Sequence, residues 1–371
     1  MKKVAKRLTV PHCGGGGQKM EVEYDVIIIG SGPAGSSAAK SLTQRGLETL
    51  ILEKEKLPRY KCCSGVLFGE AQELLKIFFG ELPPEEVYCK PKIINASNIQ
   101  LHKEGESPSQ WYWEWPKKNK TFTKEYLNIW RNLFDNWLAI RSEATIIDDC
   151  PFMKFEFEDE KIKVFAGRGE KKPIFWCKYL IGADGGNSRV RDILDPEFKK
   201  TYQELVVNQV YHEIEYLGIE VDKWYLFQAP DLGNIFASVH VKDDLLTLCA
   251  GTSQGNKIKS YIEKLINLLE EKHNTRVGRF IRQEGCIINN MFVTGNFHQG
   301  RGRVLLTGEA AGLLHMNGSG IDTALDSGYR AGEAVLEALE SGIDAYQRYY
   351  DRTKDIRDHI RKCAKHQQML T

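Results

Sequence analysis

Three glycines near the start of the chain have the spacing of a motif that binds dinucleotides. Gly30, Gly32 and Gly35 form a G-x-G-x-x-G turn between an expected strand at residues 25–29 and an expected helix at residues 36–45. The first glycine permits a tight turn, the second lets a pyrophosphate approach the backbone, and the third lets the helix pack on the strand. The N-terminus of the helix then offers free N–H groups and a partial positive charge to phosphate.

An acidic residue follows at the distance that this motif requires. A second expected strand, residues 49–52, ends in Glu53, whose carboxylate can accept hydrogen bonds from ribose hydroxyls. The complete unit of strand, turn, helix, strand and acid favours a bound dinucleotide over a glycine turn without a ligand. By itself, the motif over residues 24–53 does not separate a nicotinamide dinucleotide from a flavin dinucleotide.

Three further segments indicate how the chain is organised around this turn. Apolar residues with a period near 3.6 predict a helix at residues 126–138, which leads into an apolar segment at 144–147. A strand and turn occupy residues 179–186. Residues 303–309 form another strand and turn, followed by a long helix that ends near Leu339. Because nucleotide-type turns lie at both ends of the chain, we expect the cofactor domain to be discontinuous.

The middle of the chain has a different pattern. Residues 235–241 and 245–249 alternate between apolar and polar, which predicts an antiparallel sheet with one solvated face, and residues 257–272 form an amphipathic helix. We therefore predict an α/β protein with a discontinuous Rossmann-like cofactor domain and an antiparallel β-sheet substrate domain. The predicted segments are a flexible leader (1–23), a cofactor domain (24–70, 124–198 and 296–345), a substrate domain (71–123 and 199–295) and a C-terminal helix (346–371).

Composition and charge exclude several classes of function. The chain has 371 residues, 42% hydrophobic and 27% charged, and its net charge of +1 gives no long-range field that would attract nucleic acid. Nine cysteines without a C-x-x-C pair argue against a disulfide framework or a zinc ribbon, and they indicate a reducing cytoplasm. We predict no metal site. Since no apolar run approaches the ~18 residues of a membrane span, we expect membrane contact to be peripheral at most.

Two later segments resemble signatures of the flavoprotein-hydroxylase superfamily. Residues 180–191 resemble its second signature. Residues 307–312 resemble its third, in which an acid contacts the ribityl chain of FAD, and Gly308-Glu309 occupies that position. The resemblance implies that the dinucleotide is FAD. It also implies that the turn at residues 317–321 places a helix N-terminus near the pyrimidine edge of the flavin, where it can stabilise negative charge.

Within this superfamily, the sequence is similar to the geranylgeranyl reductase family. Residues 57–65 resemble the family's Pro-Arg-x-Lys-x-Cys-Gly-Gly segment, residues 131–138 its Arg-x-x-Phe-Asp-x-x-Leu helix, and residues 346–350 its tyrosine-bearing terminal helix. The likeness covers nearly the whole chain from residue 24, although Ser64 stands where the family has a glycine. It implies a flavoprotein-hydroxylase-like fold. It also implies reduction, or the reverse dehydrogenation, of a carbon–carbon double bond in a hydrophobic, isoprenoid-like substrate.

The motifs also assign roles to individual residues. Cys63 matches the family cysteine at the flavin face, where a thiol could donate a proton, with a packing role as the alternative. His315 lies between the last two glycine turns and is a second candidate proton donor, with a hydrogen-bonding loop histidine as the alternative. Cys62 is expected to be structural, and a vicinal Cys62–Cys63 redox pair would be strained. The cofactor contacts expected from the motifs are Gly30, Gly32, Ala34, Gly35, Glu53, Lys54, Lys61, Ser64, Gly65, Arg131, Asp184, Gly308, Glu309, Gly318, Gly320 and Ile321.

Other reactions of the superfamily stay open at this point. One is a flavin monooxygenase or halogenase that acts on a small metabolite, and another is a redox-neutral, flavin-dependent cyclase. Residues 111–116 fit the Trp-x-Trp-x-x-Pro pattern of flavin halogenases, but they precede the second signature instead of following it, which favours an aromatic strand lining the substrate cavity. Because there is no second G-x-G-x-x-G unit, the electron donor is expected to be transiently bound NAD(P)H or a ferredoxin-like carrier.

Overall fold

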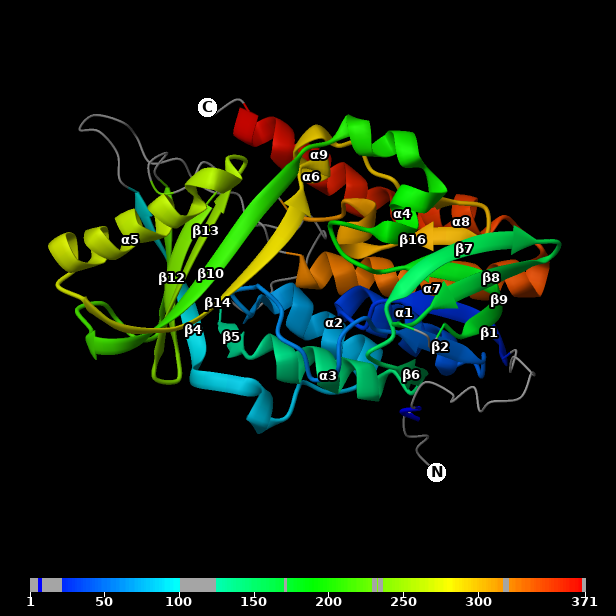
Figure 1. Cartoon of the computed structure of the whole chain (residues 1–371), viewed down its shortest axis with the longest axis horizontal. Coiled ribbons are helices and arrows are strands. Elements are labelled where there is room, and N and C mark those ends of the chain that lie inside the picture. The colour runs from blue at the N-terminus through cyan, green and yellow to red at the C-terminus, as the bar shows by residue number, and fades with distance from the viewer. Residues whose placement is uncertain are drawn as a thin grey trace.

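Two eight-stranded β-sheets organise the computed structural model, which describes residues 6–8, 22–100, 125–169, 172–228, 232, 236–315 and 320–368. Strands from both ends of the sequence build the first sheet, and strands from the middle build most of the second (Figure 1). The predicted α/β organisation, with a Rossmann-like part and a second sheet, is confirmed. The exact domain boundaries stay a prediction.

The first sheet is mainly parallel. Every neighbouring pair in the order β16-β9-β1-β2-β6 is parallel, and a β7–β8 hairpin joins the sheet through β9. Residues 26–29 and 50–52 are buried, as expected where helices cover both faces of a parallel sheet. The strands are β1 (Val22–Ile29), β2 (Thr49–Leu52), β6 (Thr145–Ile147), β7 (Phe152–Glu158), β8 (Lys161–Ala166), β9 (Ile174–Gly182), β15 (Gly300–Arg301) and β16 (Val304–Leu306).

Two helices from opposite ends of the sequence pack closely beside this sheet. α1 (Pro33–Thr43) follows the glycine turn, and α7 (Ile321–Ser341) comes from the last part of the chain. A Cβ atom at Gly328 or Gly332 of α7 would overlap with atoms of α1, so only glycine permits this approach. The Ser37 hydroxyl also donates a hydrogen bond across the interface, 2.8 Å from the Leu325 carbonyl oxygen. The cofactor domain is therefore discontinuous, as predicted.

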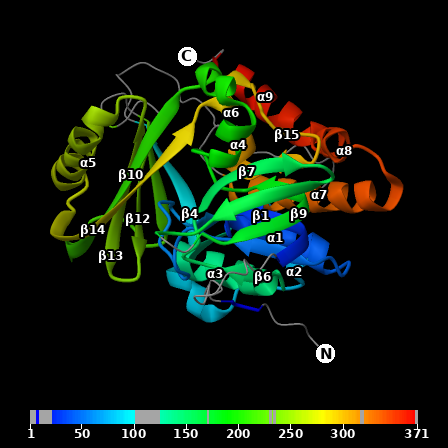
Figure 2. The same cartoon turned by 45° about the vertical axis from the view of Figure 1, so that its right-hand side comes forward.

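The second sheet has the strand order β14-β10-β13-β12-β11-β4-β5-β3. It differs from the predicted antiparallel sheet in one pair, because β11 and β4 run parallel. Helix α5 (Ile258–Lys272) covers its outer face, where Leu265 and Leu269 pack with apolar residues of the sheet (Figures 1 and 2). The strands are β3 (Val66–Leu67), β4 (Tyr88–Gln100), β5 (Tyr126–Ile129), β10 (Glu204–Tyr216), β11 (Lys223–Gln228), β12 (Phe236–Lys242), β13 (Leu245–Thr252) and β14 (Arg276–Asn289). The remaining helices of the core are α2 (Gly69–Phe79), α3 (Arg131–Arg141), α4 (Arg189–Leu194) and α6 (Met291–Thr294). The helix predicted at residues 126–138 was therefore wrong at its start, because residues 126–129 form β5, which pairs with β3 and β4.

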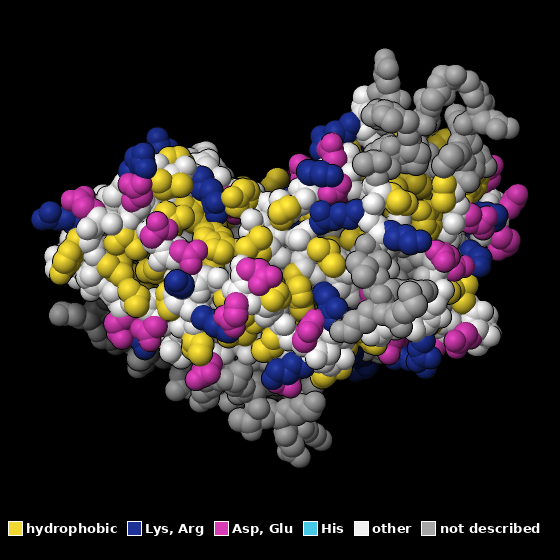
Figure 3. Space-filling view, turned by 90° about the horizontal axis from the view of Figure 1, so that it is seen from below, with side chains coloured by type: hydrophobic (Ala, Val, Ile, Leu, Met, Phe, Trp, Pro, Cys, Tyr) yellow, Lys and Arg dark blue, Asp and Glu magenta, His cyan; other side chains and the backbone are white. Residues whose placement is uncertain are grey.

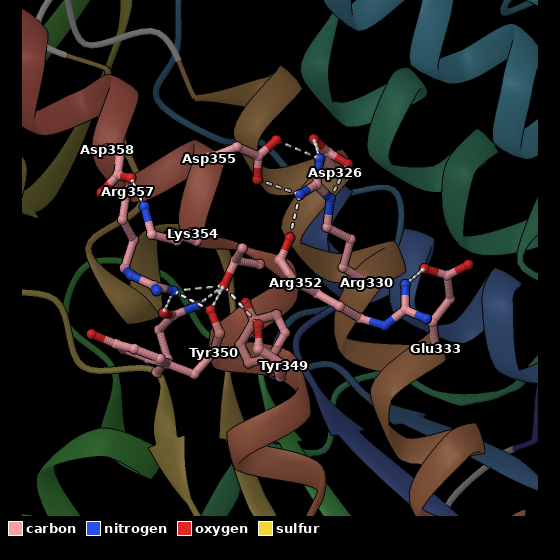
Figure 4. Close-up of polar contacts among 12 residues, drawn as sticks. Asp326, Arg330, Glu333, Tyr349, Tyr350, Arg352, Lys354, Asp355, Arg357 and Asp358 are labelled. Atoms are coloured by element: carbon pink, nitrogen blue, oxygen red, sulfur yellow. Dashed lines mark hydrogen bonds and ion pairs between the residues drawn. The ribbon is translucent and has the colours of Figure 1, made fainter.

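The C-terminal segment, predicted as one helix, forms two: α8 (Ala345–Arg352) and α9 (Lys354–Gln368). Arg330 of α7 joins them to the core, since its guanidinium bonds the Asp326 carboxylate and lies 2.5 Å from an oxygen of Asp355 in α9 (Figure 4). Ile356 and Ile360 of α9 are fully buried. The terminal helices are therefore part of the folded core and not an appended solvated helix.

None of the helices in the described ranges is both long enough and apolar enough to cross a bilayer. On the face seen in Figure 3, acidic and basic side chains are interspersed among hydrophobic ones. On that face, charges of opposite sign therefore lie near one another, in keeping with the net charge of +1.

Candidate cofactor and substrate site

The glycine turn has the geometry that a bound pyrophosphate needs. Gly30 adopts φ +101°, and a Cβ atom there would lie 2.5 Å from the Ala183 carbonyl oxygen. Gly35 packs directly against the Gly30 carbonyl, so a side chain at residue 35 would clash with the turn. Around Gly32, in contrast, the nearest atom to such a Cβ is Nη2 of Arg59 at 4.0 Å. Gly32, the N-cap residue of α1, has no side chain with which to cap the helix, which leaves the N–H groups of the first turn available to phosphate.

Glu53 is buried at the end of β2 and anchors the turn. Its Oε2 atom accepts hydrogen bonds from the Ser31 amide at 3.1 Å and the Ser31 hydroxyl at 2.7 Å. The same oxygen lies 3.2 Å from Nε of Arg59. The other oxygen, Oε1, accepts a hydrogen bond from the Glu55 amide at 3.2 Å. The carboxylate therefore fixes the turn relative to β2, and its contact with a ribose stays a prediction.

A buried ion network lies next to Glu53. Asp135, with no exposed surface, receives two hydrogen bonds from Arg131, at 2.9 and 3.0 Å, and one from Arg59 at 2.9 Å. Burial alone would raise the pKa of Asp135, but the two guanidinium groups lower it overall. Asp135 thus carries a stable negative charge that holds both arginines in place, and it was not among the residues singled out from the sequence.

Arg131 also reaches Cys63, the predicted proton donor. The guanidinium lies near enough to the Cys63 sulfur for the sulfur to raise the pKa of Arg131, and the Gly65 amide donates a hydrogen bond to the same sulfur at 3.4 Å. Gly65 has φ +67°, and a side chain there would collide with the Ile129 carbonyl at the end of β5. Two sequence-predicted residues, Cys63 and Arg131, are therefore in direct contact, and Gly65 fixes the loop that carries the thiol.

The third predicted turn comes back to the first. Gly308 has φ +58°, and a Cβ atom there would lie 2.9 Å from the Cβ of Ala34 in α1. Glu309 interacts with the half-buried Lys61 amine. Burial would lower the pKa of Lys61, but the negative charges of Cys286 and Glu309 raise it overall. One Glu309 oxygen, Oε1, is buried without a hydrogen-bond partner in the part of the chain that the structure describes, so it is an acceptor available to a ligand.

Other predicted contacts have different surroundings. The Asp184 carboxylate accepts hydrogen bonds from the Ser188 hydroxyl at 2.5 Å and the Val190 amide at 3.1 Å, so it organises the start of α4. Lys54 is exposed, and its carbonyl accepts a hydrogen bond from Arg168. Gly320 and Ile321 lie at the start of α7. Gly318 and the aromatic segment at 111–116 lie outside the described residues, and all of these roles stay predictions.

His315 is held by the first turn of α7. Its Nε2 atom lies 2.8 Å from Oδ2 of the buried Asp322, and its ring packs edge-on against the His359 ring at a centroid distance of 5.3 Å. Burial would raise the pKa of Asp322, but His315 and the backbone amides lower it overall. This arrangement orients the imidazole, and a catalytic role for it stays a prediction.

We expect His359 to make the protein less stable as the pH falls from about 6.5 to 4. Burial first, and then the positive charge of His315, lowers the pKa of His359 to about 4, whereas an unfolded histidine titrates near 6.5. The unfolded state binds the proton first, so about 3 kcal/mol of unfolding free energy should be lost over this interval. Urea unfolding of the wild type and His359→Gln at several pH values measures the difference. An equal loss in the variant would assign the effect to other groups.

The inner face of the second sheet carries a polar surface that the sequence did not reveal. His240 of β12 is buried, and its Nε2 atom lies 3.0 Å from the Ser64 carbonyl oxygen, so this face is turned toward the Cys63 loop. Four side chains follow one another across neighbouring strands of this face, each directly opposite the next: Arg282 (β14), Tyr211 (β10), Thr247 (β13) and His240 (β12). Buried side-chain atoms without a hydrogen-bond partner within the described ranges include Nδ1 of His240, Oγ1 of Thr247, Nη2 of Arg282 and Oε1 of Gln209.

These atoms give the site both donors and acceptors. Burial lowers the pKa of His240 well below its usual value, so its ring is neutral. Since Nε2 donates to the Ser64 carbonyl, Nδ1 is left as an acceptor. The Arg282 guanidinium lies 4.2 Å from the ring centres of both Tyr60 and Tyr211. Unpaired buried polar groups are costly, so this face is suited to a ligand with polar groups or to bound water.

Comparison with protein families decides which dinucleotide this site serves. A family model described as "FAD binding domain" matches residues 152–358, more than half of the chain. The chain belongs to this FAD-binding family. A second model, described as "Pyridine nucleotide-disulphide oxidoreductase", matches residues 24–193, which include the glycine turn. The protein is therefore an FAD-dependent oxidoreductase, and the expectation of FAD is confirmed.

Individual relatives of this FAD-binding protein bear out the resemblance to geranylgeranyl reductases. Digeranylgeranylglycerophospholipid reductase 3 of Methanosphaera stadtmanae is 25% identical over 357 residues, which cover 92% of this chain and 84% of that protein. A geranylgeranyl bacteriochlorophyll reductase-like protein of Thermoplasma acidophilum has the same fold, with a TM-score of 0.70, 18% identity and coverage of 93% and 85%. The p-nitrophenol 4-monooxygenase of Pseudomonas putida also shares the fold, with a TM-score of 0.67, 17% identity and coverage of 93% and 88%.

The residues on this chain fit FAD. The uncapped N-terminus of α1 and the open space at Gly32 accommodate a pyrophosphate. Glu53 lies at the end of β2, where a ribose would come. The unpartnered Oε1 atom of Glu309 is a buried acceptor on the turn whose acid contacts the ribityl chain in the superfamily. Positions far apart in the sequence thus offer FAD a phosphate site and two carboxylates.

Proposed function

We propose that this protein reduces, or in reverse forms, a carbon–carbon double bond of a hydrophobic, isoprenoid-like substrate. The observation that carries the proposal is the position of Cys63. The thiol is bound by Arg131 and the Gly65 amide, on a loop that lies beneath the inner face of the second sheet. A proton-bearing side chain between the flavin site and a second domain is what double-bond reduction requires. The names of the reductases to which the chain is similar support the same reaction.

FAD, when bound, supplies the hydride chemistry, and the protein supplies position and protons. The N-terminus of α1 holds the pyrophosphate, and Glu53 and Glu309 hold the sugar hydroxyls. Arg131, itself fixed by Asp135, orients the Cys63 thiol. The proton that the second carbon atom of the double bond needs is held on the sulfur of Cys63. Electrons come from NAD(P)H or a ferredoxin-like carrier.

The polar inner face of the sheet favours a second candidate, a flavin monooxygenase that acts on a compact polar metabolite. Neutral His240, Thr247, Gln209 and Arg282 offer unpartnered atoms there, and a hydrocarbon chain would leave them unsatisfied. The double-bond reductase accommodates the same atoms only if its substrate also brings a polar group to this face. The two candidates therefore differ in the part of the substrate that contacts these four side chains: the whole of a compact polar metabolite, or only the polar group of a hydrophobic one.

A single set of measurements separates these candidates. The flavin is reduced without oxygen, and geranylgeranyl diphosphate or 4-nitrophenol is then added. Reoxidation by geranylgeranyl diphosphate in the absence of oxygen supports the reductase. Oxygen uptake that 4-nitrophenol stimulates, with no anaerobic reoxidation by geranylgeranyl diphosphate, contradicts it and supports the monooxygenase.

We expect Cys63→Ala to slow anaerobic reoxidation by about a hundredfold or more, because the proton donor is lost. The matched control is Cys177→Ala, which removes a buried thiol of β9 in the core of the first sheet. The control should keep the wild-type rate. An unchanged rate in Cys63→Ala, with FAD still bound, would reduce this cysteine to a packing role.

A further inference from the structure

Two cysteines that are far apart in the sequence meet where the Cys63 loop contacts the second sheet. The sulfur of Cys62 lies 3.9 Å from the Val207 carbonyl oxygen, and Val207 is the direct cross-strand partner of Cys286 in β14. The sulfur of Cys286 in turn lies 4.0 Å from the Cys62 carbonyl oxygen. The Cys62 and Cys286 thiols also interact with each other, since each changes the pKa of the other. Both sulfur atoms are therefore within reach of each other.

The neighbouring Cys63 does not take part in this contact. Its sulfur is bound by Arg131 and lies 3.4 Å from the Gly65 amide. The side chains of Cys62 and Cys63 thus have different partners, one on the second sheet and one on α3. A vicinal Cys62–Cys63 disulfide would require both to leave these positions, so Cys286 is the partner that the fold offers to Cys62.

The charges around the pair distinguish its two members. The contact with Cys62 first, and then the Lys61 and Arg131 cations, lower the pKa of Cys286 in spite of burial and the nearby Glu309 carboxylate. The same contact and burial raise the pKa of Cys62 well above its usual value. In contrast, burial raises the pKa of Cys89 and Cys150 to about 11. Cys286 is therefore the more easily ionised and more nucleophilic thiol of the two, and Cys62 is the partner that keeps its proton.

We propose that Cys286 and Cys62 form a redox-active pair that peroxide converts to a disulfide. The Cys286 thiolate attacks hydrogen peroxide and becomes a sulfenic acid, and with one proton taken up the leaving oxygen departs as water. The Cys62 thiol then attacks the Cys286 sulfur, forms the S–S bond and expels a second water. In sum, one thiolate, one thiol, one proton and one peroxide give one disulfide and two waters.

The disulfide would connect the loop of Cys63 covalently to strand β14. That loop carries Ser64 and Gly65, which already contact His240 and the end of β5. Formation of the Cys62–Cys286 disulfide would therefore fix the Cys63 loop against the polar face of the second sheet. Since Lys61 and Glu309 lie beside Cys286, loss of the thiolate also changes the charge next to the expected ribityl position.

The test starts from the fully reduced whole protein, treated with hydrogen peroxide and then with N-ethylmaleimide. Peptide mass spectrometry should show the peptides of Cys62 and Cys286 joined, with the mass of two hydrogens lost. Cys62→Ser should instead leave a sulfenic acid on Cys286 that dimedone traps, and Cys286→Ser should leave Cys62 open to alkylation. Cys177→Ser serves as the control, and it should give the wild-type disulfide.

The nucleophile is tested separately by the rate at which N-ethylmaleimide alkylates Cys286. Lys61→Gln should slow this rate about tenfold near neutral pH, since one pKa unit of lost thiolate stabilisation has that effect. A Cys62–Cys63 or Cys249–Cys286 disulfide in the wild type would overturn the proposal. So would complete alkylation of Cys62 and Cys286 after peroxide treatment. Peptide mass spectrometry of the wild-type protein shows which cysteines form a disulfide, so the test stands even if a serine variant does not fold.

Discussion

Gly35→Ala should abolish FAD binding and destabilise the protein by about 3 kcal/mol. An added Cβ atom would lie inside the van der Waals radius of the Gly30 carbonyl oxygen and 3.2 Å from Cγ2 of Ile28 in β1. The Gly30 carbonyl is a backbone group, and it cannot move away without opening the turn that joins β1 to α1. Flavin absorbance per protein after purification and denaturant unfolding measure the two effects.

Gly32→Ala and Gly285→Ala are the matched controls for this prediction. A Cβ at residue 32 meets only Arg59 at 4.0 Å, so Gly32→Ala should keep its stability but lose FAD affinity, because the methyl group occupies the approach of the pyrophosphate. A Cβ at Gly285 lies 3.8 Å from the Val207 carbonyl, an ordinary contact, so that variant should resemble the wild type in both respects. Full FAD content in Gly32→Ala would contradict the assignment of the turn to the pyrophosphate.

Asp135→Asn should lower the unfolding free energy by about 3–5 kcal/mol, because it leaves two buried guanidinium groups without their shared carboxylate. Arg131 and Arg59 make three hydrogen bonds to Asp135, all between 2.9 and 3.0 Å. Their mutual repulsion would then be uncompensated, and Arg131 would no longer hold Cys63. Chemical unfolding measures the loss, and the alkylation rate of Cys63 reports its changed surroundings.

An exposed ion pair provides the comparison for Asp135→Asn. Lys154 and Glu156 pair on β7 with about half of each side chain exposed, so Glu156→Gln should change the unfolding free energy by less than about 1 kcal/mol. If Asp135→Asn cost no more than this, the Arg59–Asp135–Arg131 network would not stabilise the fold.

The parts of the site that could be predicted are those encoded locally. The strand, turn and helix at residues 25–45 form one continuous unit, so Gly30, Gly32 and Gly35 could be placed from spacing alone. The resemblance assigned Gly308 to the cofactor site, but its close approach to Ala34 was not predicted, because no local pattern encodes it. Asp135 was noted only as part of the motif at residues 131–138 and was given no role, although its i,i+4 spacing from Arg131 on one predicted helix was a usable signal.

The polar face of the second sheet could not be predicted in the same way. The alternation of residues 235–241 shows that His240 lies on one face, but not which face is turned inward. That choice depends on the pairing of β12 with β13 and on the contact of His240 with Ser64, at a separation of 176 residues. The Cys62–Cys286 contact spans 224 residues, and no local pattern indicates it.

The close packing of α1 against α7 has a consequence for the order of events during synthesis. The glycine turn leaves the ribosome well before its supporting helix α7, which contains Gly328 and Gly332 and comes after both sheets have been made. Until then the N-terminal strand, turn and helix lack one side of their core, and such long-range contacts form slowly. FAD capture is therefore a late event, and a truncated nascent chain that ends before α7 should emerge without flavin.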